Sequence, residues 1–332
     1  MIPHNKVCLR SEDEYVLSGV VRSGQLAQGP HLSAFEDELA ERFRPGGAAA
    51  CVSSGTAALR LAAIALDPDG ETVWTVPTYA CTALLHALDG SSAFGVMRVA
   101  MADCTAGTLN APQATVIVHT YGVPCPVPEG TIEDFTHAPG AEIEDKPCGS
   151  FGAASVISFG ATKPLGCGVG GAVLGPPDLI EAVKDMRDYD GKRDLRPRFN
   201  WQMGELTAAL GRQRLARLDE ENTQRFRMAL LYLAICQGKG LHVYGYGSST
   251  YYRFVVRVPD PADAIQHFAE HGVQVINPLR TDELLHRQLG LPPEDFPVAE
   301  DAAQHTISLP IWPGMAEVDV TCVVEALKGL TL

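Results

Sequence analysis

The chain has 332 residues, 46% of them hydrophobic, and a formal net charge of −14 at pH 7. This size and composition predict a globular protein with one large domain and a smaller companion. The acidic balance argues against nucleic acid or an anionic membrane surface as a partner. No apolar run reaches the roughly 18 residues of a membrane span, and the first residues lack the apolar segment of a signal peptide.

Nine cysteines are scattered through the chain, and no two have Cys-x-x-Cys spacing. This pattern predicts neither a metal site nor a disulfide framework. Several cysteines lie in apolar surroundings, as reduced cysteines do in cytoplasmic proteins. We therefore expect a cytoplasmic protein without a metal.

The first part of the chain alternates predicted helices and strands. Residues 11–27 indicate a helix with a break at Ser23-Gly24, and residues 32–43 carry apolar side chains at amphipathic helical spacing. Strand-like runs follow, with helical segments between them. They cover residues 48–52, 72–76, 94–99 and 114–119. This rhythm predicts an α/β fold with a mostly parallel sheet.

The segment Ser53-Ser54-Gly55-Thr56-Ala57 connects the strand at 48–52 to a helix. A glycine turn that leads into a helix leaves backbone N–H groups unpaired at the positive end of the helix dipole. Such a terminus binds phosphate, which makes Gly55, Thr56 and Ala57 candidate ligands. The alternative is a simple helix cap.

Two further segments carry candidate site residues. Tyr79 and Cys81 follow the strand at 72–76, and Asp134 and His137 lie in the segment 131–137. An acid at the carboxyl end of a strand lies where ligands bind in open α/β sheets. Taken alone, Tyr79 and Cys81 also fit a core, Asp134 a helix cap and His137 the surface.

Lys163 lies between two apolar runs, residues 154–159 and 172–174, in a turn rich in glycine. Glycines allow the backbone to approach a bound group closely. A desolvated lysine in such a turn can act as a nucleophile in Schiff-base chemistry. The alternative is a solvated turn lysine.

A basic run occupies residues 185–200. It contains Arg187, Lys192, Arg193, Arg196 and Arg198. Such a run is usually a solvated loop; the functional alternative is a clamp for a substrate diphosphate, with Arg193 and Arg196 as the candidates. From about residue 220 the pattern changes to a long helix at 222–237, strands at 251–258 and 273–276, and helices at 261–272 and 317–328. We therefore divide the chain into a large α/β domain, residues 1–220, and a small α+β domain, residues 221–332.

Taken together and in this order, the motifs resemble the DegT/DnrJ/EryC1/StrS family of pyridoxal-phosphate (PLP) aminotransferases. The matches are Ser-Gly-x-x-x-x-Gly-Pro at 23–30, Ser-Gly-Thr at 54–56, Pro-x-Tyr-x-Cys at 77–81, Glu-Asp at 133–134, Phe-x-Ala-Thr-Lys-Pro-Leu at 159–165 and Ser-Leu-Pro-x-x-Pro-x-Met at 308–315. The resemblance implies the fold-type I architecture of PLP-dependent transferases. It covers about residues 23–327.

The resemblance also implies roles for single residues. Lys163 would form the Schiff base with PLP, Asp134 would face the pyridine nitrogen, and His137 would lie near the ring oxygen. Gly55, Thr56, Ala57 and Ser158 would hold the phosphate, and Asn200 would reach the phosphate of the neighbouring subunit in a homodimer. Cys81 stands where other members carry an aromatic residue over the ring, so either Cys81 or Tyr79 would cover it. Gln202 and Val169 replace a family arginine and a family acid.

The function implied is transfer of an amino group from an amino acid, in the family commonly glutamate or glutamine, to a keto sugar. The pattern of the family leads us to expect that this sugar is nucleotide-linked. Its cofactor would alternate between PLP and pyridoxamine phosphate (PMP). One alternative is a PLP enzyme with a non-sugar acceptor or another reaction. A second is a non-catalytic regulatory protein of the same fold, against which the joint presence of Lys163, Asp134 and Ser158 argues.

Overall fold

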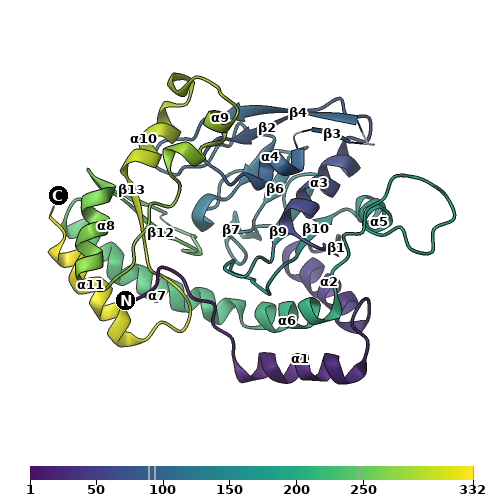
Figure 1. Cartoon of the computed structure of the whole chain (residues 1–332), viewed down its shortest axis with the longest axis horizontal. Helices are drawn as coiled ribbons and strands as arrows, with labels where there is room; N and C mark the ends of the chain where they lie inside the picture. Colours follow the sequence, from purple (N-terminus) through teal and green to yellow (C-terminus); the bar gives the residue numbers. More distant parts are fainter. Residues whose placement is uncertain (89, 93–94, 246, 332) are drawn as a thin grey trace.

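The computed structural model describes residues 1–88, 90–92, 95–245 and 247–331. Figure 1 shows a large α/β part on one side and a smaller part, which holds the C-terminus, on the other. Among the described residues, no helix combines the length and the apolar character needed to cross a membrane. All nine cysteines are free thiols, and six of them are buried, as expected for reduced core cysteines.

The central sheet has five strands in the order β1-β10-β9-β6-β5. They are β1 (Ala48–Val52), β5 (Val116–Val118), β6 (Ile132–Asp134), β9 (Ala154–Ser158) and β10 (Gly171–Gly175). Strands β5, β6 and β9 are parallel, whereas β10 is antiparallel to both β9 and β1. Four strands therefore run in one direction, and their carboxyl ends meet at one edge.

A second sheet extends the first beyond β5. It contains β2 (Val73–Pro77), β3 (Gly90–Ser92) and β4 (Gly95–Ala102) in the order β2-β4-β3. The N–H of Thr115 donates to the carbonyl of Thr75 at 2.8 Å and joins β2 to the start of β5. The strand predicted at 94–99 corresponds to β4, except that Phe94 lies outside the described residues. A short hairpin, β7 (Glu142–Ile143) with β8 (Lys146–Pro147), lies further along the chain.

Helices cover both faces of the central sheet. One face packs against α3 (Gly55–Leu66), α4 (Ala83–Leu88) and α5 (Pro177–Met186), and the other against α2 (Pro30–Phe43) and α6 (Glu205–Ala216). Strand β1 shows why: Ala50 and Val52 belong to the first core, and Ala49 and Cys51 to the second. Successive strand residues point to opposite faces, so an all-apolar strand needs cover on both.

The smaller part has its own antiparallel sheet in the order β11-β12-β13. Its elements are α7 (Leu218–Gly238), β11 (Val243–Tyr244), β12 (Phe254–Arg257), α8 (Pro261–Glu270), α9 (Leu285–Gln288), α10 (Pro297–His305), β13 (Thr306–Leu309) and α11 (Glu317–Gly329). A separate core joins α7, α8 and α11 to this sheet. That separation supports a division near residue 220, which we keep as a proposal.

One predicted element of this part is wrong. Residues 273–276 form no strand; Val273 and Ile276 each make one isolated bridge, to Ile2 and to Ser308. Because Ile2 bridges to Val273, the beginning of the chain lies against the smaller part, as the adjacent N and C labels in Figure 1 also show.

Helix α1 (Ser11–Ser23) is attached to the body by buried charges. Arg217 donates to both carboxylate oxygens of Asp13 at 2.7 Å and to Glu221 at 3.0 Å. Glu221 also accepts from Arg214 at 2.9 Å. We call these four residues the Arg217 network; each of its charges has an opposite partner.

Candidate active site

A cavity of about 300 Å³ opens at the carboxyl ends of the central strands. Its walls come from the ends of β5, β6 and β9, from the start of α3 and from Tyr252 and Arg253 of the smaller part. This volume is at the lower end of the range for small-molecule sites, roughly 300–1,000 Å³. Ligands bind at this edge in open α/β sheets because the loops that leave the strands diverge there.

The N-terminus of α3 forms one end of the cavity. Ser54 caps this helix, with its Oγ accepting the N–H of Ala57 at 3.0 Å. Gly55 and Thr56 line the cavity, and their first-turn N–H groups have no partner within the helix. A Cβ on Gly55 would lie 2.6 Å from the Cβ of Ser158, so only glycine lets the helix end approach β9 this closely. N–H groups, a hydroxyl and the helix dipole thus converge where a phosphate fits.

Lys163 lies in a tightly folded loop between β9 and β10. Its N–H donates to the carbonyl of Gly160, and its own carbonyl accepts the N–H of Gly166, both at 2.8 Å. A Cβ on Gly166 would meet the carbonyl oxygen of Ala161 at 2.4 Å. The glycines therefore permit the fold of the loop that directs the Lys163 amine into the cavity.

Asp134 ends strand β6 and lines the same cavity. One of its carboxylate oxygens accepts the N–H of Thr136 at 3.0 Å. Burial raises the pKa of this carboxyl above its usual value, although the hydrogen bonds from Thr136 oppose the shift. A desolvated carboxylate gains most from a cationic partner, which a protonated pyridine nitrogen would supply.

His137 connects Lys163 to the smaller part. Its Nδ1 accepts the backbone N–H of Tyr121 at 3.3 Å, its Nε2 lies 2.8 Å from Nζ of Lys163, and its ring stacks on Tyr252 at 4.3 Å between centroids. Burial lowers the pKa of His137 well below its usual value, which keeps the imidazole neutral. The ring proton then lies on Nε2, directed at the Lys163 amine.

The cavity gathers most of the predicted site residues. Gly55, Thr56, Tyr79, Cys81, Asp134, His137, Ser158 and Lys163 all line it. Ala57 does not, because its N–H is taken by the Ser54 cap. Tyr79 is only 2% exposed, and its hydroxyl accepts from Tyr121 at 3.0 Å, whereas Cys81 is exposed. Cys81 is thus the more accessible of the two candidates for covering a ring.

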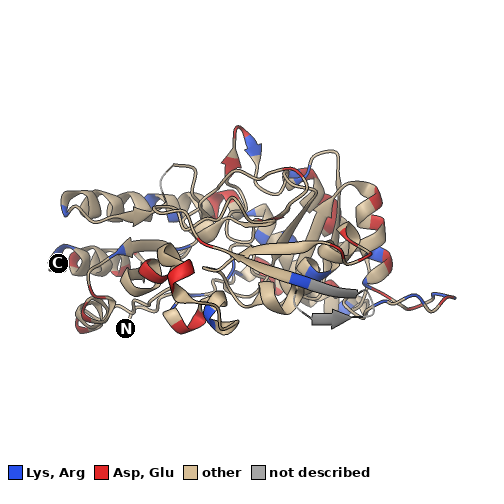
Figure 2. Cartoon of the chain, turned by 90° about the horizontal axis from the view of Figure 1, so that it is seen from above, with Lys and Arg blue, Asp and Glu red and all other residues tan. Residues whose placement is uncertain are grey.

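The five basic residues of the run at 185–200 differ in burial and in their partners. Most of this run projects from the body as a loop after α5, with both signs of charge along it (Figures 1 and 2). Three of its five cations have acidic partners within the chain. Arg187 is buried against Glu36, Lys192 pairs with Asp185 at 2.7 Å, and Arg198 pairs with Asp185 and Asp194. Arg193, Arg196 and Asn200 are exposed and lie outside the cavity of their own chain.

The cavity residues that the sequence reasoning did not assign include Ser54, Tyr121, Tyr252 and Arg253. The sequence did offer a signal for Ser54, because serine is a preferred residue at the position just before a helix, where its side chain caps a backbone N–H of the first turn. Tyr121 has a backbone φ of 58°, a conformation that residues other than glycine rarely adopt. Tyr252 and Arg253 sit just before β12 and look like strand residues, so only the packing of the two parts reveals them.

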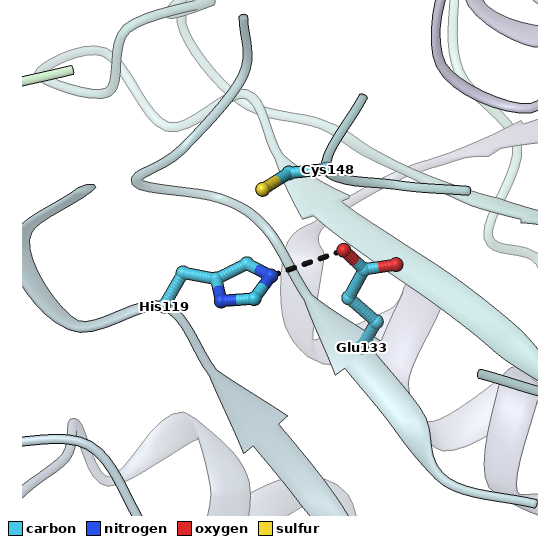
Figure 3. A group of neighbouring side chains, drawn as sticks. All are labelled: His119, Glu133 and Cys148. Carbon is cyan, nitrogen blue, oxygen red and sulfur yellow. Dashed lines mark hydrogen bonds and ion pairs between the residues drawn. The ribbon is translucent and has the colours of Figure 1, made fainter. Parts of the chain in front are cut away.

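Behind Asp134 lies a buried polar cluster of His119, Glu133 and Cys148 (Figure 3). Glu133 accepts from His119 at 3.0 Å, from the N–H groups of Gly149 and Phe151 and from Ser155. Nδ1 of His119 accepts the N–H of Cys125. These bonds occupy the carboxylate and both ring nitrogens, and they position the strand end that carries Asp134.

Known proteins match this chain over almost its full length. The model of the DegT/DnrJ/EryC1/StrS aminotransferase family matches residues 7–328. A GDP-perosamine synthase of Vibrio cholerae is 27% identical, with 99% of each chain covered. A dTDP-3-amino-3,4,6-trideoxy-alpha-D-glucose transaminase of Streptomyces venezuelae is 28% identical, with 96% of this chain and 92% of that one covered.

A solved structure agrees with the fold. The crystal structure of S. venezuelae DesV in complex with a ketimine intermediate has a TM-score of 0.86 and 28% identity, and the match covers 97% of this chain and 94% of that one. The expected fold-type I architecture is therefore confirmed. The chain belongs to the DegT/DnrJ/EryC1/StrS family and is a PLP-dependent aminotransferase.

Proposed function

We propose that this aminotransferase moves an amino group from glutamate or glutamine to the keto carbon of a nucleotide-linked sugar. The observation that carries the proposal is the shared cavity of Lys163, Asp134 and the α3 terminus. The printed names of two relatives, a GDP-perosamine synthase and a dTDP-amino-sugar transaminase, support a nucleotide-sugar acceptor.

The residues that line the cavity suit PLP. Gly55, Thr56 and Ser158 would hold the phosphate, Asp134 would pair with the pyridine nitrogen, and Cys81 would cover one face of the ring. When bound, PLP withdraws electrons from the carbon that carries the amino group. The raised pKa of Asp134 makes a pyridinium its natural partner, since the charge pair offsets the cost of burying the carboxylate.

Lys163 would bind the cofactor and then move a proton. Its amine is the one lysine nitrogen among the described residues that line the cavity. Nε2 of His137 lies 2.8 Å from this amine, a contact that would position the amine within the cavity. A positioned base of this kind contributes roughly 10²- to 10⁴-fold to a rate.

Assembly would complete the site. The loop around residues 187–198 projects away from the body, and Leu195 on it is fully exposed at 102%. A loop that projects in this way can reach a second copy of the chain in a symmetric dimer. In a two-fold dimer, Asn200, Arg193 and Arg196 would each reach the partner's cavity. We also propose a cytoplasmic location, which the free buried cysteines support.

The non-catalytic alternative is disfavoured because the cavity brings Lys163, Asp134 and Ser158 together. A non-sugar acceptor is the remaining competitor, and Val169, an apolar side chain 68% exposed at the cavity wall, is the residue that would favour it.

A half-reaction screen tests the proposal. Amino acids are offered to the PLP form, and conversion to the PMP form is followed by absorbance. Keto sugars with and without a nucleotide are then offered to the PMP form. Glutamate or glutamine as donor, with a nucleotide-linked keto sugar as acceptor, is the expected pair. Reaction only with free sugars or with simple keto acids would contradict it.

A further inference from the structure

Arg253 is a partly buried cation that has no acidic partner among the described residues. Its Nη1 is inaccessible to solvent and has no hydrogen-bond partner among the described residues. No ion pair to Arg253 is formed within the described part of the chain either, although acids pair with many other arginines. A guanidinium nitrogen that is shielded from water and lacks an acceptor costs free energy, so Arg253 is suited to bind an anionic ligand.

The position of Arg253 defines where that ligand lies. Arg253 lines the active-site cavity and also borders a small hollow beside His4 and Asn5 that has no measurable free volume. Only the cavity can therefore admit an anion. Asp134 is the single acid among the described residues of the cavity wall, and its role is to pair with the cofactor ring.

Arg253 and Lys163 lie against the same aromatic ring. The guanidinium carbon of Arg253 is 5.5 Å from the ring centroid of Tyr252, and Nζ of Lys163 is 5.2 Å from it. The ring face attracts the guanidinium while no anion is present. An anion bound to Arg253 would thus lie next to the atoms that react.

We propose that Arg253 binds the carboxylate of the amino-acid donor. This inference rests on the proposed amino-transfer function. The α-carboxylate is attached to the same carbon as the reacting amine, so it must lie close to Lys163. The diphosphate of a nucleotide sugar is separated from the keto carbon by the sugar ring. Arginine suits a carboxylate because its planar fork donates two parallel hydrogen bonds.

As a consequence, the two half-reactions should depend differently on Arg253. The donor needs Arg253, whereas a neutral keto sugar that occupies the same space does not. Arg253 then selects amino acids over amines without a carboxylate, and the Tyr252 ring holds the guanidinium between turnovers.

The test compares Arg253→Gln with Arg253→Lys and with the control Arg257→Gln. Arg257 belongs to the same strand region but pairs with Asp301 and lies outside the cavity wall, so its loss removes an equal charge elsewhere. Glutarate, a dicarboxylate that cannot react, is titrated calorimetrically into each protein. The donor and acceptor half-reactions are measured separately with glutamate and with the keto sugar.

We expect Arg253→Gln to weaken glutarate and glutamate binding roughly 10- to 100-fold, with Arg253→Lys intermediate and Arg257→Gln unchanged. The acceptor half-reaction of the PMP form should be unaffected. The melting temperature of Arg253→Gln should change little, since only the contact with the Tyr252 ring is lost; a large fall would indicate a structural role and overturn the proposal.

Unchanged glutarate binding in Arg253→Gln would also overturn it. Loss of the acceptor half-reaction alone would mean that an acidic acceptor, not the donor, uses Arg253. If the wild-type protein transfers no amino group but binds glutarate through Arg253, the proposed function fails while the carboxylate site remains.

Discussion

The Arg217 network and the active-site cavity both bury charged side chains, but they use them differently. In the network, Arg217 and Arg214 share Glu221, and Asp13 accepts two bonds from Arg217. In the cavity, Arg253 has no acidic partner among the described residues, and burial raises the pKa of Asp134. Paired charges attach one helix to another, whereas unpaired charges await a ligand.

This difference predicts opposite consequences of mutation. Variants in the cavity should lose activity and keep stability, because their charges contribute little to folding. Variants in the network should lose stability and keep the activity of the molecules that remain folded. The expected effects follow in order of decreasing size.

Lys163→Ala should show the largest loss of activity. Without the amine, the donor half-reaction should slow by at least about 10³-fold, while the melting temperature stays within about 1 °C of the wild type. Borohydride reduction of the PLP-loaded protein and peptide mapping should label Lys163. Lys146→Ala, an exposed lysine on β8, is the control, and a label on Lys146 or Lys184 would contradict the assignment.

Arg217→Gln should produce the largest loss of stability. It leaves the buried carboxylate of Asp13 without its main partner, and breaking a buried pair costs about 3–5 kcal/mol. Denaturant unfolding measures this change. The kcat of the folded variant should match that of the wild type. A lower kcat with an unchanged free energy of unfolding would show that Arg217 acts in catalysis and not in stability.

Asp134→Asn should retain PLP but lose roughly 10²-fold in transamination, because a neutral amide cannot hold a charge on the pyridine nitrogen. Its unfolding free energy should be equal to or above that of the wild type, since a desolvated carboxyl is removed. Bound cofactor is measured by absorbance after gel filtration. Turnover near the wild-type value would show that a group other than Asp134 pairs with the pyridine nitrogen.

Acid should weaken the attachment of α1 through Asp13. Burial acts to raise the pKa of this carboxyl, but hydrogen bonds from Arg217 outweigh it and hold the pKa below its usual value. The stabilisation is therefore complete above the unfolded pKa of about 3.9 and is lost as the pH falls through the lower folded value. Unfolding free energies measured from about pH 5 downward should fall less steeply in Asp13→Asn than in the wild type.

The smallest effect is expected for Arg193→Ala combined with Arg196→Ala. These exposed arginines would contact the acceptor only across a dimer interface, so the acceptor KM should rise by a few-fold, on the order of one rim charge pair. The donor half-reaction should be spared. An unchanged acceptor KM, or a monomer in sedimentation that is fully active, would show that Arg193 and Arg196 do not bind the acceptor across a dimer interface.

Local sequence patterns predicted the parts of this protein that depend on neighbours in the chain. The turn at 53–57 became the capped start of α3, and the apolar runs around Lys163 became β9 and β10. Gly55, Asp134, Ser158 and Lys163 could be predicted to share one site because each lies at or just after the end of a strand, and the carboxyl ends of these strands meet at one edge. These features are set over a few residues, where glycine geometry and apolar alternation act directly.

Tertiary structure alone decided which charges are free. Arg187 looked available in the sequence and is buried on Glu36, whereas Arg253 looked like a strand residue and lines the cavity. Ala57 matched the phosphate motif, yet its N–H is used by Ser54. Such pairings join residues far apart in the chain, and the free energy of a charge depends on its burial and its partner. The sequence therefore determined the fold and the chemical groups, and the packing of the two parts determined which of them can meet a substrate.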